Sequence, residues 1–113
     1  MIIVYGICKD ESAFAERFMR SMAGVDRVIL CDTGSTDGTP DILRSLGAEV
    51  NEITVAPWRF DLARNMALSY VPPEARICIS MDLDEVLLPN WRETLEKAWT
   101  PETTMLRYPF IHN

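Results

Sequence analysis

Basic side chains are scarce in this sequence. The chain has 113 residues, in which 17 acids outnumber 11 lysines and arginines and leave a formal net charge of −6. Nucleic-acid backbones and anionic membrane surfaces are bound through clustered Lys and Arg. The composition therefore argues against nucleic acid or an anionic membrane as the main partner, and it leaves room for a bound cation.

Long apolar runs are also absent. No stretch approaches the roughly 20 apolar residues that a transmembrane helix needs. The opening segment 1–7 has no positively charged region before it and leads directly into Lys9, Asp10 and Glu11. We therefore interpret it as a first strand and not as a signal peptide. The expectation is a chain with no transmembrane segment and a cytoplasmic location.

Cysteine and histidine are few. Cys8, Cys31 and Cys78 fall in or at the end of predicted strands, and an odd number at such spacing gives no disulfide framework. We expect all three to be small buried side chains in a reducing cytoplasm. The single histidine, His112, is next to the last residue and is interpreted as a solvated side chain.

Glycine-rich phosphate-binding motifs are missing as well. No Gly-x-Gly-x-x-Gly follows the first strand, and no Gly-Lys-Ser/Thr loop occurs anywhere. The sequence therefore supports neither a dinucleotide-dependent dehydrogenase nor a P-loop nucleotide hydrolase. A nucleotide held by acids, with a metal on its phosphates, remains compatible with the sequence.

The predicted elements alternate between strand and helix. Strands are expected at about 2–7, 27–31, 49–55, from 77 onward and at 103–111, and helices at about 13–22, 40–46, 62–71 and 90–99. This pattern is typical of one α/β domain over residues 1–113, with a mostly parallel, Rossmann-like sheet and helices on both faces. The polar strand 49–55 suits a sheet edge. If the fourth strand lies beside the first, opposite the second, a ligand crevice opens between their carboxyl ends.

Two helices have a recognisable apolar face. The residues expected to be buried are Phe14, Phe18, Met19 and Met22 in the first helix and Leu62, Ala63, Met66, Ala67 and Tyr70 in the third. Arg64 falls off the second of these faces and lies in the first turn, where the helix dipole disfavours a cation. We therefore expect an anionic partner for Arg64, either Asp61 or a phosphate.

Three acids follow the fourth strand directly. The run from Ile77 to Met81 is short, apolar and β-branched, which favours a strand buried on both faces. If the chain stays extended, Asp82 and Asp84 project to one side while Leu83 points back to the core. Two carboxylates make a hard oxygen site suited to Mg²⁺ or Mn²⁺. The alternative interpretation is a solvated acidic turn.

Four segments in order resemble the family 2 glycosyltransferases of the GT-A fold. They are Lys9–Glu11, Asp32–Thr39, Phe60–Asn65 and Asp82–Glu85. The resemblance covers about residues 2–99 and is nearest to bacterial members that carry a Phe-x-x-Ala-Arg-Asn segment. It implies a domain that binds a nucleoside-diphosphate sugar, with a UDP-sugar as the first expectation, and transfers a hexosyl group with inversion to an acceptor.

The resemblance also implies roles for individual residues. The nucleotide would be bound by Cys8, Lys9, Asp10, Glu11, Asp32, Arg64 and Asp82; a divalent cation, Mn²⁺ or Mg²⁺, by Asp82 and Asp84; and the sugar or the groups behind the metal would be near Glu85 and Asn65. The catalytic base of the family belongs to the later, acceptor-side half of the fold. Since the chain stops soon after the metal motif, we expect the base beyond Asn113. The acceptor is open and could be a saccharide, a lipid-linked group or a protein.

Two alternatives remain open on sequence grounds. A haloacid-dehalogenase-like phosphotransferase also carries an Asp-x-Asp-x-Val motif after a buried strand, which the segment 82–86 fits. That family places the motif on its first strand, whereas here it comes late. The other alternative is a non-catalytic nucleotide-binding half domain completed by a partner. The strand expected at 103–111 would then pair with another chain, for instance in a homo-oligomer.

Overall fold

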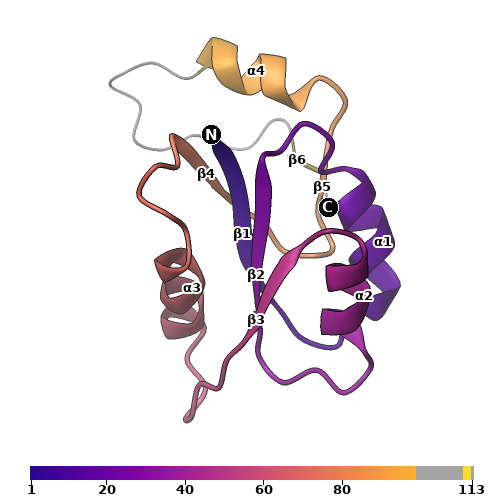
Figure 1. The fold of residues 1–113 in the computed structure, drawn as a ribbon, viewed down its shortest axis with the longest axis vertical. Coiled ribbons are helices and arrows are strands. Elements are labelled where there is room, and N and C mark those ends of the chain that lie inside the picture. Colours follow the sequence, from indigo (N-terminus) through magenta and orange to yellow (C-terminus); the bar gives the residue numbers. More distant parts are fainter. Residues whose placement is uncertain (99–110, 113) are drawn as a thin grey trace.

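Four parallel strands form the centre of the protein, whose computed structural model describes residues 1–98 and 111–112 (Figure 1). They are β1 (Ile2–Cys8), β2 (Arg27–Asp32), β3 (Glu49–Glu52) and β4 (Ile77–Ser80), in the order β3-β2-β1-β4. Cys8 is in register with Asp32, and Tyr5 with Ser80. The order confirms the predicted sheet, with β3 at one edge and the reversal between β1 and β4.

Helices cover both faces of this sheet. They are α1 (Ser12–Arg20), α2 (Thr39–Ser45), α3 (Phe60–Ser69) and α4 (Trp91–Ala98). Figure 1 shows α1 and α2 together on one side and α3 on the other. Alternate residues of β1 accordingly enter two cores: Val4 packs in the cluster that includes Phe18 of α1, and Ile7 packs with Ala63 of α3. The predicted α/β architecture with helices on both faces is confirmed.

A second, smaller sheet joins distant parts of the chain. β5 (Val86–Leu87) pairs antiparallel with β6 (Ile111–His112). Most of the predicted strand 103–111 lies outside the described residues. The described end of that segment pairs within its own chain, and pairing with a second chain stays a prediction. No helix in residues 1–98 has the length and apolar character needed to span a bilayer.

The strand β4 is buried on one face only, so the prediction of a fully buried strand was wrong. Ile77 and Ile79 are buried, whereas Cys78 is exposed. The physical reason is position: β4 is an edge strand, and α3 packs against β1 and β2. The expectation of a buried thiol holds for Cys8 and Cys31 and fails for Cys78.

The apolar helix faces are narrower than predicted. In α3 the fully buried residues are Ala63 and Ala67, while Leu62 and Tyr70 are 43% and 45% exposed. Alanine lets α3 approach the sheet closely, which leaves the larger side chains on its flanks. In α1 Phe18 is buried but Phe14 is exposed, with the Arg17 guanidinium 5.7 Å from its ring centre.

Candidate functional site

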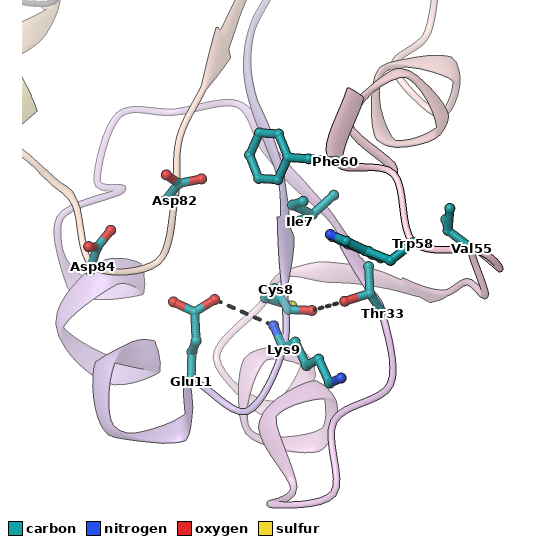
Figure 2. A pocket seen from close by; sticks show the side chains of 10 residues that line it. All are labelled: Ile7, Cys8, Lys9, Glu11, Thr33, Val55, Trp58, Phe60, Asp82 and Asp84. Atoms are coloured by element: carbon teal, nitrogen blue, oxygen red, sulfur yellow. Dashed lines mark hydrogen bonds between the residues drawn. The ribbon is translucent and has the colours of Figure 1, made fainter. Parts of the chain in front are cut away.

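A cavity of about 590 Å³ opens at the carboxyl ends of β1 and β4 (Figure 2). Its volume falls in the range of small-molecule sites. Its walls are Ile7, Cys8, Lys9 and Glu11 at the end of β1, Thr33 after β2, Val55, Trp58 and Phe60 on the way into α3, and Asp82 and Asp84 after β4. The cavity therefore lies at the crevice that the strand order predicts.

The two aspartates reach the cavity from a turn. The Met81 backbone N–H still bonds to the Tyr5 carbonyl at 3.0 Å, but the chain then turns, with the Glu85 N–H donating to the Asp82 carbonyl at 3.0 Å. The chain is therefore not extended through the acids, which was the condition for the predicted convergence of Asp82 and Asp84. Both carboxylates nevertheless line one cavity, because the fully buried Leu83 anchors the turn as predicted.

Side chains outside the turn hold it in place. Glu85 accepts a hydrogen bond from the Asp82 N–H at 2.9 Å, so its carboxylate closes the turn instead of lining the cavity. From α1, the Arg17 guanidinium donates to the Asp84 carbonyl at 2.8 Å. The position of the carboxylate pair thus depends on both a local contact and one from a distant helix.

A glycine permits the close approach of β1 and the end of β4. A Cβ atom on Gly6 would lie 2.1 Å from the Met81 carbonyl oxygen. Real atoms never approach that closely, so any side chain here would force the strands apart. The absence of a side chain at Gly6 is one reason why the turn that follows Met81 sits against the end of β1.

The acidic side of the cavity has an unfavourable concentration of negative charge. Figure 2 shows Glu11 turned toward the same space as Asp82 and Asp84. Burial raises the pKa of the Glu11 carboxyl above its ordinary value, and the Lys9 backbone N–H at 3.4 Å partly opposes that shift. The charges of Asp84 and Asp82 raise the Glu11 pKa further. A cation placed here would relieve this repulsion.

The two carboxylates fit a hard divalent cation that takes its remaining ligands from a substrate and from water. Among residues 1–98 and 111–112, no group of three or more His, Cys, Asp or Glu side chains is arranged to hold a metal by itself. Mg²⁺ and similar ions are commonly bound by one or two carboxylates together with substrate phosphates and water. Asp82 and Asp84 match that pattern better than they match a closed protein cage.

The family resemblance implies that Asp32 binds the nucleotide, but Asp32 does not line the cavity. It is 1% exposed and accepts hydrogen bonds from the Gly34 and Ser35 N–H groups at 3.1 and 2.8 Å and from the Ser35 hydroxyl. The Cys8 thiol lies 3.6 Å from Asp32 Oδ1, the oxygen that also accepts from the Ser35 hydroxyl. Burial first, and then the charge of Asp32, raise the pKa of the Cys8 thiol far above its ordinary value. Cys8 is therefore a protonated thiol whose contribution is to shape the wall.

Asp10 also faces away from the cavity. It has a positive φ of 50°, and its carboxylate accepts from the Thr36 N–H at 2.7 Å, while its own N–H donates to the Ser35 hydroxyl at 2.8 Å. Asp37 returns the contact by accepting from the Ser12 N–H at 3.1 Å. These reciprocal bonds clamp the loop after β1 to the loop after β2, which positions Lys9 and Glu11 indirectly.

The anionic partner of Arg64 is Asp82, and because α3 begins at Phe60, Arg64 lies in the second turn of the helix and not, as predicted, in the first. Its guanidinium lies 3.6 Å from Asp82 and 4.6 Å from the centre of the Phe60 ring. The local alternative, Asp61, is paired with Arg59 instead. Arg64 does not itself line the cavity, but it contacts Asp82 and Phe60, which do. Asn65 is exposed and does not line the cavity.

Sequence reasoning missed the apolar wall. Trp58 lies before α3 and Phe60 is the first residue of the helix; Phe60 was noted only as the start of a family motif, and neither residue was assigned to the site. Both line the cavity and are 53% and 51% exposed. The available signal was two large aromatic residues, two positions apart, at the point where the loop after a strand leads into a helix.

A parallel α/β sheet with its cavity at the reversal of strand order defines a Rossmann-like ligand-binding domain. Within that class the chain belongs to glycosyltransferase family 2, because the sequence model of the protein family "Glycosyl transferase family 2" matches residues 6–106. This membership confirms the resemblance carried by the four motifs. It also decides against a haloacid-dehalogenase-like phosphotransferase.

A curated relative is similar over most of this chain. It is the TPR repeat-containing protein Synpcc7942_0270 of Synechococcus elongatus, 32% identical over 105 residues, which are 89% of this chain and 26% of the relative. The chain therefore spans about a quarter of that protein's length. No solved structure matched the chain.

Proposed function

We propose that the cavity binds a nucleoside-diphosphate sugar together with Mn²⁺ or Mg²⁺, for inverting transfer of a hexosyl group to an acceptor. A UDP-sugar is the first candidate for the donor. The observation that carries this proposal is the meeting of Asp82, Asp84, Glu11 and Lys9 in one cavity of a family 2 glycosyltransferase domain. The acceptor is a saccharide, a lipid-linked group or a protein.

The diphosphate is assigned to the acidic side of the cavity. Asp82 and Asp84 would hold the cation, which when bound neutralises charge on the departing nucleoside diphosphate. The Arg64 guanidinium contacts Asp82 on this side and would supply a second positive charge for the phosphates. Lys9 lines the same cavity and suits contact with the ribose or a phosphate.

The remaining predicted residues have supporting tasks in this proposal. Glu85 closes the turn behind Asp82, and Asp10 and Asp32 hold the loops after β1 and β2. None of the cavity residues is assigned as the base that deprotonates the acceptor. We propose a cytoplasmic location, which the free thiols of Cys8, Cys31 and Cys78 support.

A calorimetric panel of nucleoside diphosphates, with and without Mn²⁺, tests the proposal on the wild type and on Asp84→Ala. We expect binding that depends on the metal, is tightest for a uridine nucleotide and is lost in the variant. A wild type that binds no nucleotide under any metal condition contradicts the proposal. A chain that binds the donor but neither hydrolyses nor transfers its sugar, with any acceptor offered, would favour the non-catalytic binding module.

A further inference from the structure

Two aromatic side chains on the cavity wall lie outside the hydrophobic core of the described residues. Trp58 and Phe60 are about half exposed, and neither belongs to the two hydrophobic clusters of the described residues. Val55, on the same loop, packs against the second cluster and fixes the loop to the sheet. The loop therefore has its own anchor, and the two rings are left available to a ligand.

The rings and the acids occupy different parts of the cavity. Figure 2 shows Asp82, Asp84 and Glu11 on one side and Trp58 with Val55 on the other, with Phe60 and Ile7 between them. One end of the cavity is thus charged and the other is flat and apolar. A bound molecule that matches both ends has an anionic, metal-binding part and a planar, weakly polar part.

Hydrogen-bond recognition of the planar part by Asp32 is not available in this arrangement. The Ser35 N–H donates a hydrogen bond to one Asp32 carboxylate oxygen and the Ser35 hydroxyl donates to the other, and the Asp32 side chain is 1% exposed. Recognition through the face of the planar group needs no such donor or acceptor. Aromatic side chains bind bases in this way with little preference among them, because every base has a π-face.

We propose that Trp58 and Phe60 form a stacking platform for the nucleobase of the donor, which is bound by its face and not through Asp32. This inference rests on the proposed function and assigns the part of the ligand that the acidic side does not hold. Arg64 lies on the Phe60 ring at 4.6 Å and so links the platform to the phosphate side. Because stacking tolerates different bases, the platform contributes similarly to uridine and guanosine nucleotides.

The test compares nucleotides with a ligand that has no base. Calorimetry in Mn²⁺ would measure UDP, GDP and inorganic pyrophosphate on the wild type, Trp58→Ala, Trp58→Phe and Tyr70→Ala. Tyr70 is 45% exposed at the end of α3, does not line the cavity and is the matched aromatic control. We expect Trp58→Ala to lower the affinity for UDP and GDP by about 10- to 100-fold and to leave the affinity for pyrophosphate unchanged.

Fluorescence adds a readout that a purely structural role would not change. UDP should quench the wild-type tryptophan emission, and Trp58→Phe should keep UDP affinity within a few-fold while losing that quenching. The platform is overturned if Trp58→Ala binds UDP as the wild type does, or if it loses pyrophosphate to the same extent. A wild type that binds neither UDP nor GDP overturns the proposed function itself, which separates the two failures.

Discussion

The Arg64 guanidinium lies 3.6 Å from the Asp82 carboxylate and so connects the first turns of α3 to the acidic turn after β4. The two side chains are 39% and 50% exposed, so water screens the pair and its contribution to stability is small. Its consequence is for binding. In the absence of a ligand Arg64 partly neutralises a carboxylate that we assign to the metal.

Replacing Arg64 should therefore change two affinities in opposite directions. Arg64→Met keeps an unbranched side chain against Phe60 but removes the charge. We expect Mn²⁺ alone to bind about 2- to 5-fold more tightly, because Asp82 loses a competing cation. We expect UDP in saturating Mn²⁺ to bind about 10-fold or more weakly, because the phosphates lose a charged donor. Isothermal calorimetry measures both.

Arg59→Met is the matched control for that experiment. Arg59 is exposed and pairs with Asp61 at 2.9 Å, and it is not part of the cavity wall. Its replacement should leave both affinities near wild type. If Arg64→Met also weakened the binding of Mn²⁺ in the absence of nucleotide, the inference that Arg64 competes with the metal for Asp82 would be wrong.

Glu11 is expected to reduce stability while supporting cation binding. Its pKa is raised in the fold, first by burial and then by the charges of Asp84 and Asp82. A carboxyl with a raised folded pKa stabilises the fold only in its protonated form, and that contribution is lost as the pH rises through the folded pKa. Glu11→Gln should therefore be more stable than the wild type at pH 7, by less than about 1 kcal/mol because solvent screens the site.

The pH dependence of that difference is the decisive measurement. Urea unfolding should show the advantage of Glu11→Gln shrinking as the pH falls through the raised folded pKa of Glu11 toward the ordinary pKa of a glutamate, and staying constant at lower pH. The same variant should bind Mn²⁺ more weakly than the wild type. Glu74→Gln, which removes an exposed charge far from the cavity, should show neither effect. Equal gains in the two variants would attribute the stabilisation to net charge alone.

Asp84→Asn tests the metal assignment more directly. The substitution keeps the size and hydrogen-bonding capacity of the side chain, and the backbone contact from Arg17 to the Asp84 carbonyl does not depend on it. We expect Mn²⁺ affinity to fall at least about 10- to 100-fold. Removing the metal with a chelator should weaken UDP binding in the wild type much more than in the variant. Asp41→Asn, whose carboxyl is 89% exposed on α2, should bind Mn²⁺ and UDP normally.

The sheet and the location of the site could be predicted because they follow from general rules. Alternating strands and helices require parallel strands with right-handed crossovers, and Asp82 and Lys9 then lie at one rim although they are far apart in sequence. The turn after β4 was not predicted, but the alternation of Leu83 with two acids was enough to predict that Leu83 is buried and that Asp82 and Asp84 share one side.

The uses of individual acids could not be predicted. The sequence shows a carboxylate at Asp32 and another at Asp10 but not that loop hydroxyls and N–H groups satisfy them. Those partners are set by the distance between two loops in the folded chain. Trp58 was missed for a related reason, since an aromatic residue outside any periodic segment carries no sign of whether it packs inward or lines a cavity.

The clamp between the loops after β1 and β2 should be sensitive to acid. Hydrogen bonds from Thr39 and Ser12 hold the pKa of Asp37 well below its usual range. Such a carboxyl contributes stability above its unfolded pKa, and the contribution is lost as the pH falls through the folded pKa. Asp37→Ala should therefore have a lower urea midpoint than the wild type at pH 7, with the difference narrowing at pH 3. Asp41→Ala is the control for removing a surface acid. An equal loss of urea midpoint in both variants would mean that the hydrogen bonds of Asp37 between the two loops do not account for the effect.

Gly6 should matter for both stability and binding, because it sets the distance between β1 and the acidic turn. The Cβ of Gly6→Ala would lie 2.1 Å from the Met81 carbonyl oxygen, which is backbone and cannot rotate away. We expect a loss of about 1–3 kcal/mol in urea unfolding from the forced separation of the strands. Since Asp82 follows Met81 directly, UDP affinity in Mn²⁺ should also fall in the protein that remains folded.

Gly47→Ala separates the two contributions to that result. Gly47 has a φ of +104° at the end of α2, and a Cβ there would meet nothing within 4 Å. The substitution should therefore cost stability through backbone strain alone and leave UDP affinity unchanged. Wild-type UDP affinity in folded Gly6→Ala would mean that the turn adjusts independently of β1, and the position of Asp82 would then depend on the contacts of the turn with Glu85, Leu83 and Arg17.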